Sequence, residues 1–106
     1  MNEREKKITQ LIKNKILQKD PTADVILFGS HARGQALADS DWDILILTNK
    51  KNISRVDEKE YRHELFDIEL EIGEVISAQV LSKTDWENRY YLTPLYANIK
   101  RDGIQL

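Results

Sequence analysis

The chain has 106 residues and no cysteine, and its 16 basic and 18 acidic residues leave a formal net charge of −2. Apolar residues make up 41% and charged residues 32% of the sequence, a balance that excludes a mainly disordered chain and predicts a single domain over residues 1–106. The near-neutral charge gives no strong case for direct nucleic-acid binding, and no apolar run suits a membrane helix or a signal peptide, so we expect no membrane partner and a cytoplasmic location.

The first predicted element is an amphipathic helix over roughly Glu3 to Gln18. Apolar residues recur there at the spacing of one helix face. These residues are Ile8, Leu11, Ile12 and Ile16. Asp20 and Pro21 then end the helix and lead into the first strand, because the residue before a proline disfavours helical geometry.

Two short aliphatic runs follow, Val25 to Phe28 and Ile44 to Leu47, separated by small and polar residues. Both runs are bounded by turn residues, a pattern typical of strand, turn and strand. The connection is too short for a parallel crossover with a full helix, so we expect the two strands to pair antiparallel.

Acidic residues mark the start of the second run. Side chains alternate along a strand, so Asp41 and Asp43 are expected on one side and Trp42 on the other, in the core. Two neighbouring carboxylates repel each other, and a hard divalent cation such as Mg²⁺ or Mn²⁺ would relieve that repulsion. At the end of the first run, Gly29 permits a tight bend, and the hydroxyl and amide of Ser30 suit a phosphate.

A second long helix is predicted after the second strand. Ser54 and Asp57 have the spacing of a capping pair, and Gly73 is the expected stop. The apolar stripe of this helix consists of Val56, Tyr61, Leu65, Ile68 and Ile72. We interpret Tyr61 as a core residue.

The rest of the chain predicts a third strand over Val75 to Leu81, a short helical segment starting at Ser82, and a last helix from Thr93 to Gly103. Ile104 and Leu106 are expected to fold back onto the core. Three aromatic residues could form an interface patch in a homo- or hetero-oligomer. They are Trp86, Tyr90 and Tyr91.

The polar stretch carries a family resemblance. Gly29-Ser30, ten residues, and then Asp41-x-Asp43 resemble the signature of the DNA polymerase β nucleotidyltransferase superfamily, and Ala32-Arg33-Gly34 and Ser40 agree with it. The sequence is most similar to the minimal nucleotidyltransferases (MNT proteins), which act as antitoxin partners of HEPN toxins. The resemblance implies an α/β (α+β) nucleotidyltransferase fold, with a small mixed sheet of three or more strands flanked by about four helices.

The resemblance also implies an activity: Mg²⁺-dependent (or Mn²⁺-dependent) transfer of a nucleoside monophosphate, AMP from ATP, to a hydroxyl. Asp41 and Asp43 would be the catalytic and metal-binding residues. The nucleotide-binding residues would be Gly29, Ser30, Arg33 and Ser40. Larger relatives carry a second domain for the acceptor, so at this length we expect the acceptor on a partner protein, by resemblance a tyrosine of a HEPN-type toxin.

The sequence departs from the family where a third acid normally completes the metal site. Ser77 stands at that position and Gln79 is next on the same face, while Glu71 and Glu74 would need an altered path to reach the metal. Without a positioned base, transfer rates typically fall about 10²- to 10⁴-fold. Two other readings therefore stay open: an antitoxin-like module that acts by contact alone, and a small-molecule nucleotidyltransferase.

Overall fold

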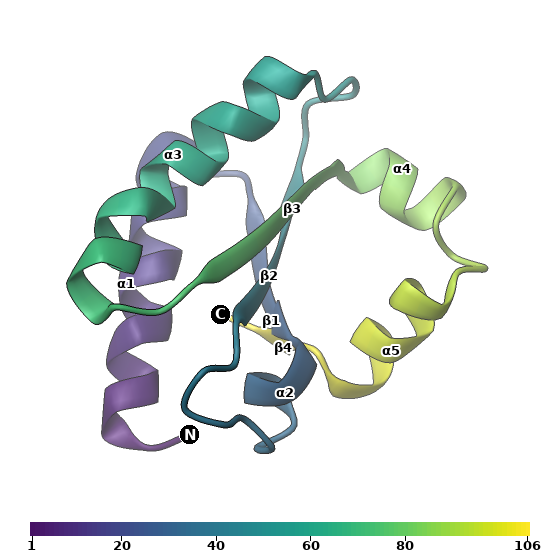
Figure 1. The fold of residues 1–106 in the computed structure, drawn as a ribbon. Helices are drawn as coiled ribbons and strands as arrows, with labels where there is room; N and C mark the ends of the chain where they lie inside the picture. The colour runs from purple at the N-terminus through teal and green to yellow at the C-terminus, as the bar shows by residue number, and fades with distance from the viewer.

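A central sheet lies between two layers of helices in the computed structural model, which describes residues 1–106 (Figure 1). The helices are α1 (Glu3–Lys19), α2 (Gly29–Ala32), α3 (Arg55–Ile72), α4 (Lys83–Asn88) and α5 (Pro94–Asp102). The strands are β1 (Asp24–Phe28), β2 (Trp42–Thr48), β3 (Ile76–Ser82) and β4 (Ile104–Gln105). None of the helices combines the length and the apolar character that crossing a bilayer requires.

The sheet is mixed, with the strand order β3-β2-β1-β4. β1 is antiparallel to β2 and to β4, whereas β2 and β3 are parallel and are joined through α3. This confirms the predicted fold class and the antiparallel first pair. β4 was not predicted as a strand, because two residues are too few to show an alternation of apolar and polar side chains. Ile104 does pack against the core, as expected.

α1 and α3 cover one face of the sheet (Figure 1). Alternate side chains of β2 enter the core on this side, and the largest of them, Trp42, is fully buried. Val56 was wrongly assigned to the apolar stripe of α3, because it sits in the first turn and its side chain is 63% exposed. Leu11 of α1 is also more exposed than expected, at 37%.

α4 and α5 lie on the opposite face (Figure 1) and close a smaller core around Leu45 and Leu47. Trp86 is buried there, and its ring lies 4.8 Å from that of Tyr96, measured between centroids. The predicted interface patch is therefore wrong for Trp86, which the short helix α4 turns inward. Among the three aromatic residues, Tyr91 is the most exposed, at 51%, and Tyr90 is partly buried.

The predicted cap of α3 is confirmed, because Ser54 and Asp57 form a reciprocal capping pair. Asn2 and Glu5 form a similar pair at the start of α1, which was not predicted. Gly73 ends α3 in the left-handed conformation (φ 70°), which favours glycine. The Thr93 cap and the proline at the start of α5 are confirmed as well.

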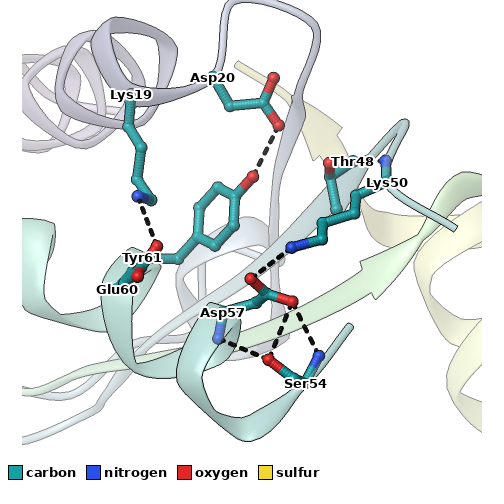
Figure 2. Close-up of polar contacts among 8 residues, drawn as sticks. All are labelled: Lys19, Asp20, Thr48, Lys50, Ser54, Asp57, Glu60 and Tyr61. Carbon is teal, nitrogen blue, oxygen red and sulfur yellow. Dashed lines mark hydrogen bonds and ion pairs between the residues drawn. The ribbon is translucent and has the colours of Figure 1, made fainter. Parts of the chain in front are cut away.

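A cluster of polar side chains connects the end of α1, the end of β2 and the first turns of α3 (Figure 2). The Tyr61 hydroxyl donates to Asp20 Oδ2 at 2.7 Å, and Lys50 Nζ donates to Asp57 Oδ1 at 2.6 Å. Burial acts to raise the pKa of Asp20, but hydrogen bonds from Thr22 and Tyr61 outweigh it and lower the pKa. These contacts make Tyr61 a structural residue, in agreement with its interpretation as core.

Candidate functional site

Two acidic side chains meet where β2 begins. Asp41 lies just before the strand and Asp43 is its second residue, opposite Phe28 in the antiparallel ladder with β1. Trp42 points into the core beneath α1 and α3, so the alternation of the strand directs Asp43 to the other face. Asp41 lies outside the strand, but it is near enough for its charge to act on Asp43.

The electrostatics of Asp43 reflect this arrangement. Partial burial raises the pKa of Asp43, and the negative charge of Asp41 raises it further. His31 and Arg33 contribute positive charge that partly lowers the pKa again. A cation bound beside Asp43 would stabilise the ionised form of this carboxylate, which burial and the neighbouring charge of Asp41 destabilise.

Gly29 connects the predicted bend directly to the acids. Its φ is +75°, a conformation that side chains rarely adopt, and a Cβ there would overlap Oδ2 of Asp43 and lie 3.0 Å from its Cγ. Only glycine lets the end of β1 approach the carboxylate this closely. The glycine and the acid are therefore parts of one site.

The segment after the glycine is a short helix rather than an open turn. α2 begins at Gly29, and no side chain caps its first turn, which holds Ser30. The first amides of a helix have no partner within the helix and can face an anion. Arg33 follows α2, is exposed, and donates from Nε to Gln35 Oε1 at 3.2 Å, so its remaining guanidinium donors are available to a ligand.

Ser40 closes the loop that returns to β2. Its Oγ accepts a hydrogen bond from the Leu37 amide at 2.8 Å, and its carbonyl oxygen lies 3.3 Å from His31 Nε2. The hydroxyl proton of Ser40 remains available as a donor. The hydroxyl of Ser40 thus accepts one structural hydrogen bond and keeps one free donor.

The third carboxylate of the family pattern has no counterpart. Ser77 lies directly opposite Asp43 in the parallel register of β2 and β3, and its exposed side chain belongs to the same face. Glu74 turns to the other side, where it accepts a hydrogen bond from Trp42 Nε1 at 3.3 Å and pairs with Arg4. Nowhere in the chain do three His, Cys, Asp or Glu side chains gather as metal ligands.

Sequence reasoning missed His31. Its ring is 6% exposed and stacks on Trp42, with the ring centroids 3.7 Å apart and the planes at 10°. A lone histidine between a serine and an alanine gives no periodic signal. Its place between Gly29-Ser30 and Arg33, inside the motif, was the available clue.

Comparisons with known proteins identify the family and the fold of the chain. The sequence model of a family described as nucleotidyltransferase domain matches residues 10–99. No curated protein matches the chain significantly.

Three solved structures share the fold. A minimal nucleotidyltransferase has a TM-score of 0.60 at 22% identity, over 96% of this chain and 95% of its own. A mutant of the MntA–HpeT toxin–antitoxin has a TM-score of 0.59 at 22% identity, over 100% and 72%. A toxin–antitoxin crystallised with AMP-PNP has a TM-score of 0.57 at 20% identity, over 95% and 70%.

Proposed function

The chain belongs to the nucleotidyltransferase domain family, and on that premise we propose that it binds ATP with Mg²⁺ and transfers AMP to a hydroxyl of a partner toxin of the HEPN type. The observation that carries the proposal is the contact between the Gly29 bend and Asp43, with Asp41 near enough for its charge to act on Asp43. A bend suited to phosphate and a pair of acids suited to a metal stand side by side. Such a reaction would draw on ATP in the cytoplasm.

The acid pair fits a divalent cation. Burial and the charge of Asp41 raise the pKa of Asp43, so the ionised form of Asp43 is destabilised, and hard carboxylate oxygens are the ligands that Mg²⁺ prefers. When bound, the ion would neutralise charge on the triphosphate oxygens during transfer. Mg²⁺ usually takes its remaining ligands from water and from substrate phosphates, so two protein carboxylates are sufficient to hold it.

The remaining motif residues would hold the nucleotide. Ser30 and the amides at the start of α2 would face the triphosphate, and Arg33 and Ser40 have free donors for its oxygens. The acceptor hydroxyl oxygen would form a bond to the α-phosphorus as the bond from that phosphorus to the β-phosphate oxygen breaks, which releases pyrophosphate. The hydroxyl proton would pass to solvent, because Ser77 offers no carboxylate to accept it.

The structural neighbours support a toxin as the partner. Two of them are toxin–antitoxin complexes, one of which was crystallised with AMP-PNP. We infer that this chain also acts on a toxin, and that the toxin belongs to the HEPN class named by the sequence resemblance.

One observation favours a second function. The position opposite Asp43 holds Ser77, so the site lacks the group that would activate the acceptor. In this second reading the chain binds nucleotide without efficient turnover and neutralises the toxin by contact.

A transfer assay separates the two functions. ATP labelled on its α-phosphate is mixed with Mg²⁺, this protein and the toxin encoded beside it. Label on the toxin that is lost in Asp43→Asn supports the enzyme, while inhibition of the toxin that survives in Asp43→Asn supports contact alone. Asp39→Asn is the matched control, since Asp39 is an exposed acid in the same loop. If calorimetry shows that ATP binds equally well with and without Mg²⁺, and that Asp41→Ala and Asp43→Ala leave the affinity unchanged, the site assignment is wrong.

A further inference from the structure

The loop that carries Asp41 is held on both sides of that residue by one ring. The imidazole of His31 stacks on the indole of Trp42 at 3.7 Å between centroids. Its Nε2 lies 3.3 Å from the carbonyl oxygen of Ser40, and because a carbonyl only accepts, Nε2 must donate. Ser40 and Trp42 are the two neighbours of Asp41 in the chain.

The ring of His31 is itself fixed to the glycine bend. His31 is the third residue of α2, which starts at Gly29, and its side chain is almost fully buried. The imidazole thus connects the segment that would face the triphosphate with the segment that would hold the metal. No other side chain makes hydrogen-bond or ring contacts to both neighbours of Asp41.

The other side of the indole is anchored as well. Trp42 Nε1 donates to Glu74 Oε1 at 3.3 Å, and Glu74 is paired with Arg4 of α1. The Trp42 amide donates to the Val75 carbonyl oxygen at 2.9 Å, next to the start of β3. The indole is therefore held in place, and the imidazole that stacks on it can hold Ser40 and the loop in one position.

The chemistry of the imidazole distinguishes a positioning role from simple packing. Its Nδ1 is buried without a hydrogen-bond partner, and the nearest acidic oxygen, Glu5 Oε2, is 3.7 Å away. A phenyl ring would keep the stack on Trp42 and avoid this unsatisfied atom. Besides the positive charge that it contributes near Asp43, the imidazole adds the bond to Ser40.

We propose that His31 is a positioning residue that fixes Asp41 and Asp43 against the Gly29 bend through Ser40 and Trp42. The inference rests on the proposed function for its effect on nucleotide binding. Its effect on the loop is independent of any ligand. Hydrogen exchange of the amides of residues 40–43 measures how often the loop opens. Calorimetry with ATP and Mg²⁺ measures the affinity of the site for nucleotide.

Three variants separate the two contacts. His31→Gln can keep a donor for Ser40 but loses the ring, His31→Phe keeps the ring but loses the donor, and His31→Ala loses both. We expect faster exchange at residues 40–43 in all three, greatest in His31→Ala, with the rest of the sheet unchanged. A buried hydrogen bond is worth about fivefold in an equilibrium, so Mg²⁺-dependent ATP affinity should fall about fivefold in His31→Phe and further in His31→Ala.

His63→Ala is the matched control, because His63 is an exposed histidine on α3 outside the site. Unchanged exchange at residues 40–43 in a folded His31→Ala protein overturns the inference. If wild-type protein binds no ATP, the proposed function fails, and the exchange data still decide the role of His31. If His31→Ala does not fold, the comparison of His31→Phe with His31→Gln decides it: equal exchange and equal affinity to wild type in both would contradict positioning.

Discussion

Ser77 of β3 lies directly opposite Asp43 of β2 in the parallel register, and both side chains belong to the face that carries the candidate site. A hydroxyl thus occupies the position from which a carboxylate could reach the acid pair. A serine neither binds Mg²⁺ strongly nor accepts the proton of an acceptor hydroxyl at neutral pH. Position 77 therefore lies beside Asp43 in the sheet but carries no charge.

The first prediction follows from the missing carboxylate at position 77. Ser77→Asp should raise the rate of AMP transfer to the toxin by about tenfold or more, since a positioned base contributes about 10²- to 10⁴-fold. It should also tighten Mg²⁺-dependent ATP binding. Gln79→Asp is the control, because Gln79 is exposed on the same strand but faces Leu45 in the register, two residues further from the acids. An equal effect of the two substitutions in the transfer assay would contradict the role of position 77.

The second prediction compares two glycines. Gly29→Ala should abolish Mg²⁺-dependent ATP binding, because the new Cβ overlaps Asp43 Oδ2 and the backbone has φ +75°. Gly34 has a similar φ of +70°, but a Cβ there meets nothing within 4 Å. Gly34→Ala should therefore cost only the backbone strain, about 1–2 kcal/mol of unfolding free energy, and leave binding intact.

Chemical denaturation and calorimetry on the two alanine variants provide the measurement. Gly29→Ala should lose more unfolding free energy than Gly34→Ala, since it carries the same strain plus the overlap. Equal losses, or binding retained by Gly29→Ala, would show that the bend does not contact the acid in solution.

The third prediction concerns pH and the pKa of Asp43. Burial and Asp41 raise this pKa, so the folded protein holds the Asp43 proton more tightly than the unfolded chain does. Above the folded pKa of Asp43, its ionised carboxylate therefore lowers the unfolding free energy. This loss of stability disappears as the pH falls from the folded pKa of Asp43 towards its ordinary value. Asp43→Asn should raise the melting temperature at pH 7 without metal. The gain in unfolding free energy should be less than about 1 kcal/mol, because solvent screens a half-buried group.

Divalent metal should reverse that order. With Mg²⁺ and ATP present, the wild-type melting temperature should rise and that of Asp43→Asn should not, because ligand binds only the folded wild type. Thermal unfolding of both proteins at pH 5 and pH 7 measures the effect. A lower melting temperature for Asp43→Asn at pH 7 without metal would mean that Asp43 stabilises the fold instead.

The fourth prediction concerns acid stability. The Lys50 ammonium and the amide and hydroxyl of Ser54 lower the pKa of Asp57 to about 2 (Figure 2). A lowered pKa adds stability above the ordinary carboxyl value, and that stability is lost as the pH falls from about 4 towards 2. Lys50→Gln should flatten the pH dependence of unfolding in this window and leave ATP binding unchanged. Circular dichroism during acid titration tests this, and an unchanged profile would contradict it.

Long elements with clear signals were predictable from the sequence. The apolar spacing of α1, the Ser54 cap and the Gly73 stop of α3, and the short connection that forces β1 and β2 antiparallel all have local causes. The alternation of Asp41, Trp42 and Asp43 also predicted which residue would be buried. These features depend on neighbouring residues, so one sequence is sufficient to read them.

The rest depends on contacts between distant parts of the chain. The turn of Trp86 into the second core requires α5 to lie beside α4, and the stack of His31 on Trp42 requires the loop to fold back. The inward bond of Glu74 to Trp42 is of the same kind, and it explains why that acid does not reach the site. Periodicity carries no information about such pairs.

The ladder that pairs Phe28 with Asp43 sets the distance between the bend and the acid through the backbone, independently of the mostly exposed residues 34–39 between them. Doubling the length of such a surface loop costs only about 0.6 kcal/mol in closure entropy. Insertions between Gly34 and Leu37 could therefore change which target the loop contacts, while the spacing of Gly29 and Asp43 stays the same.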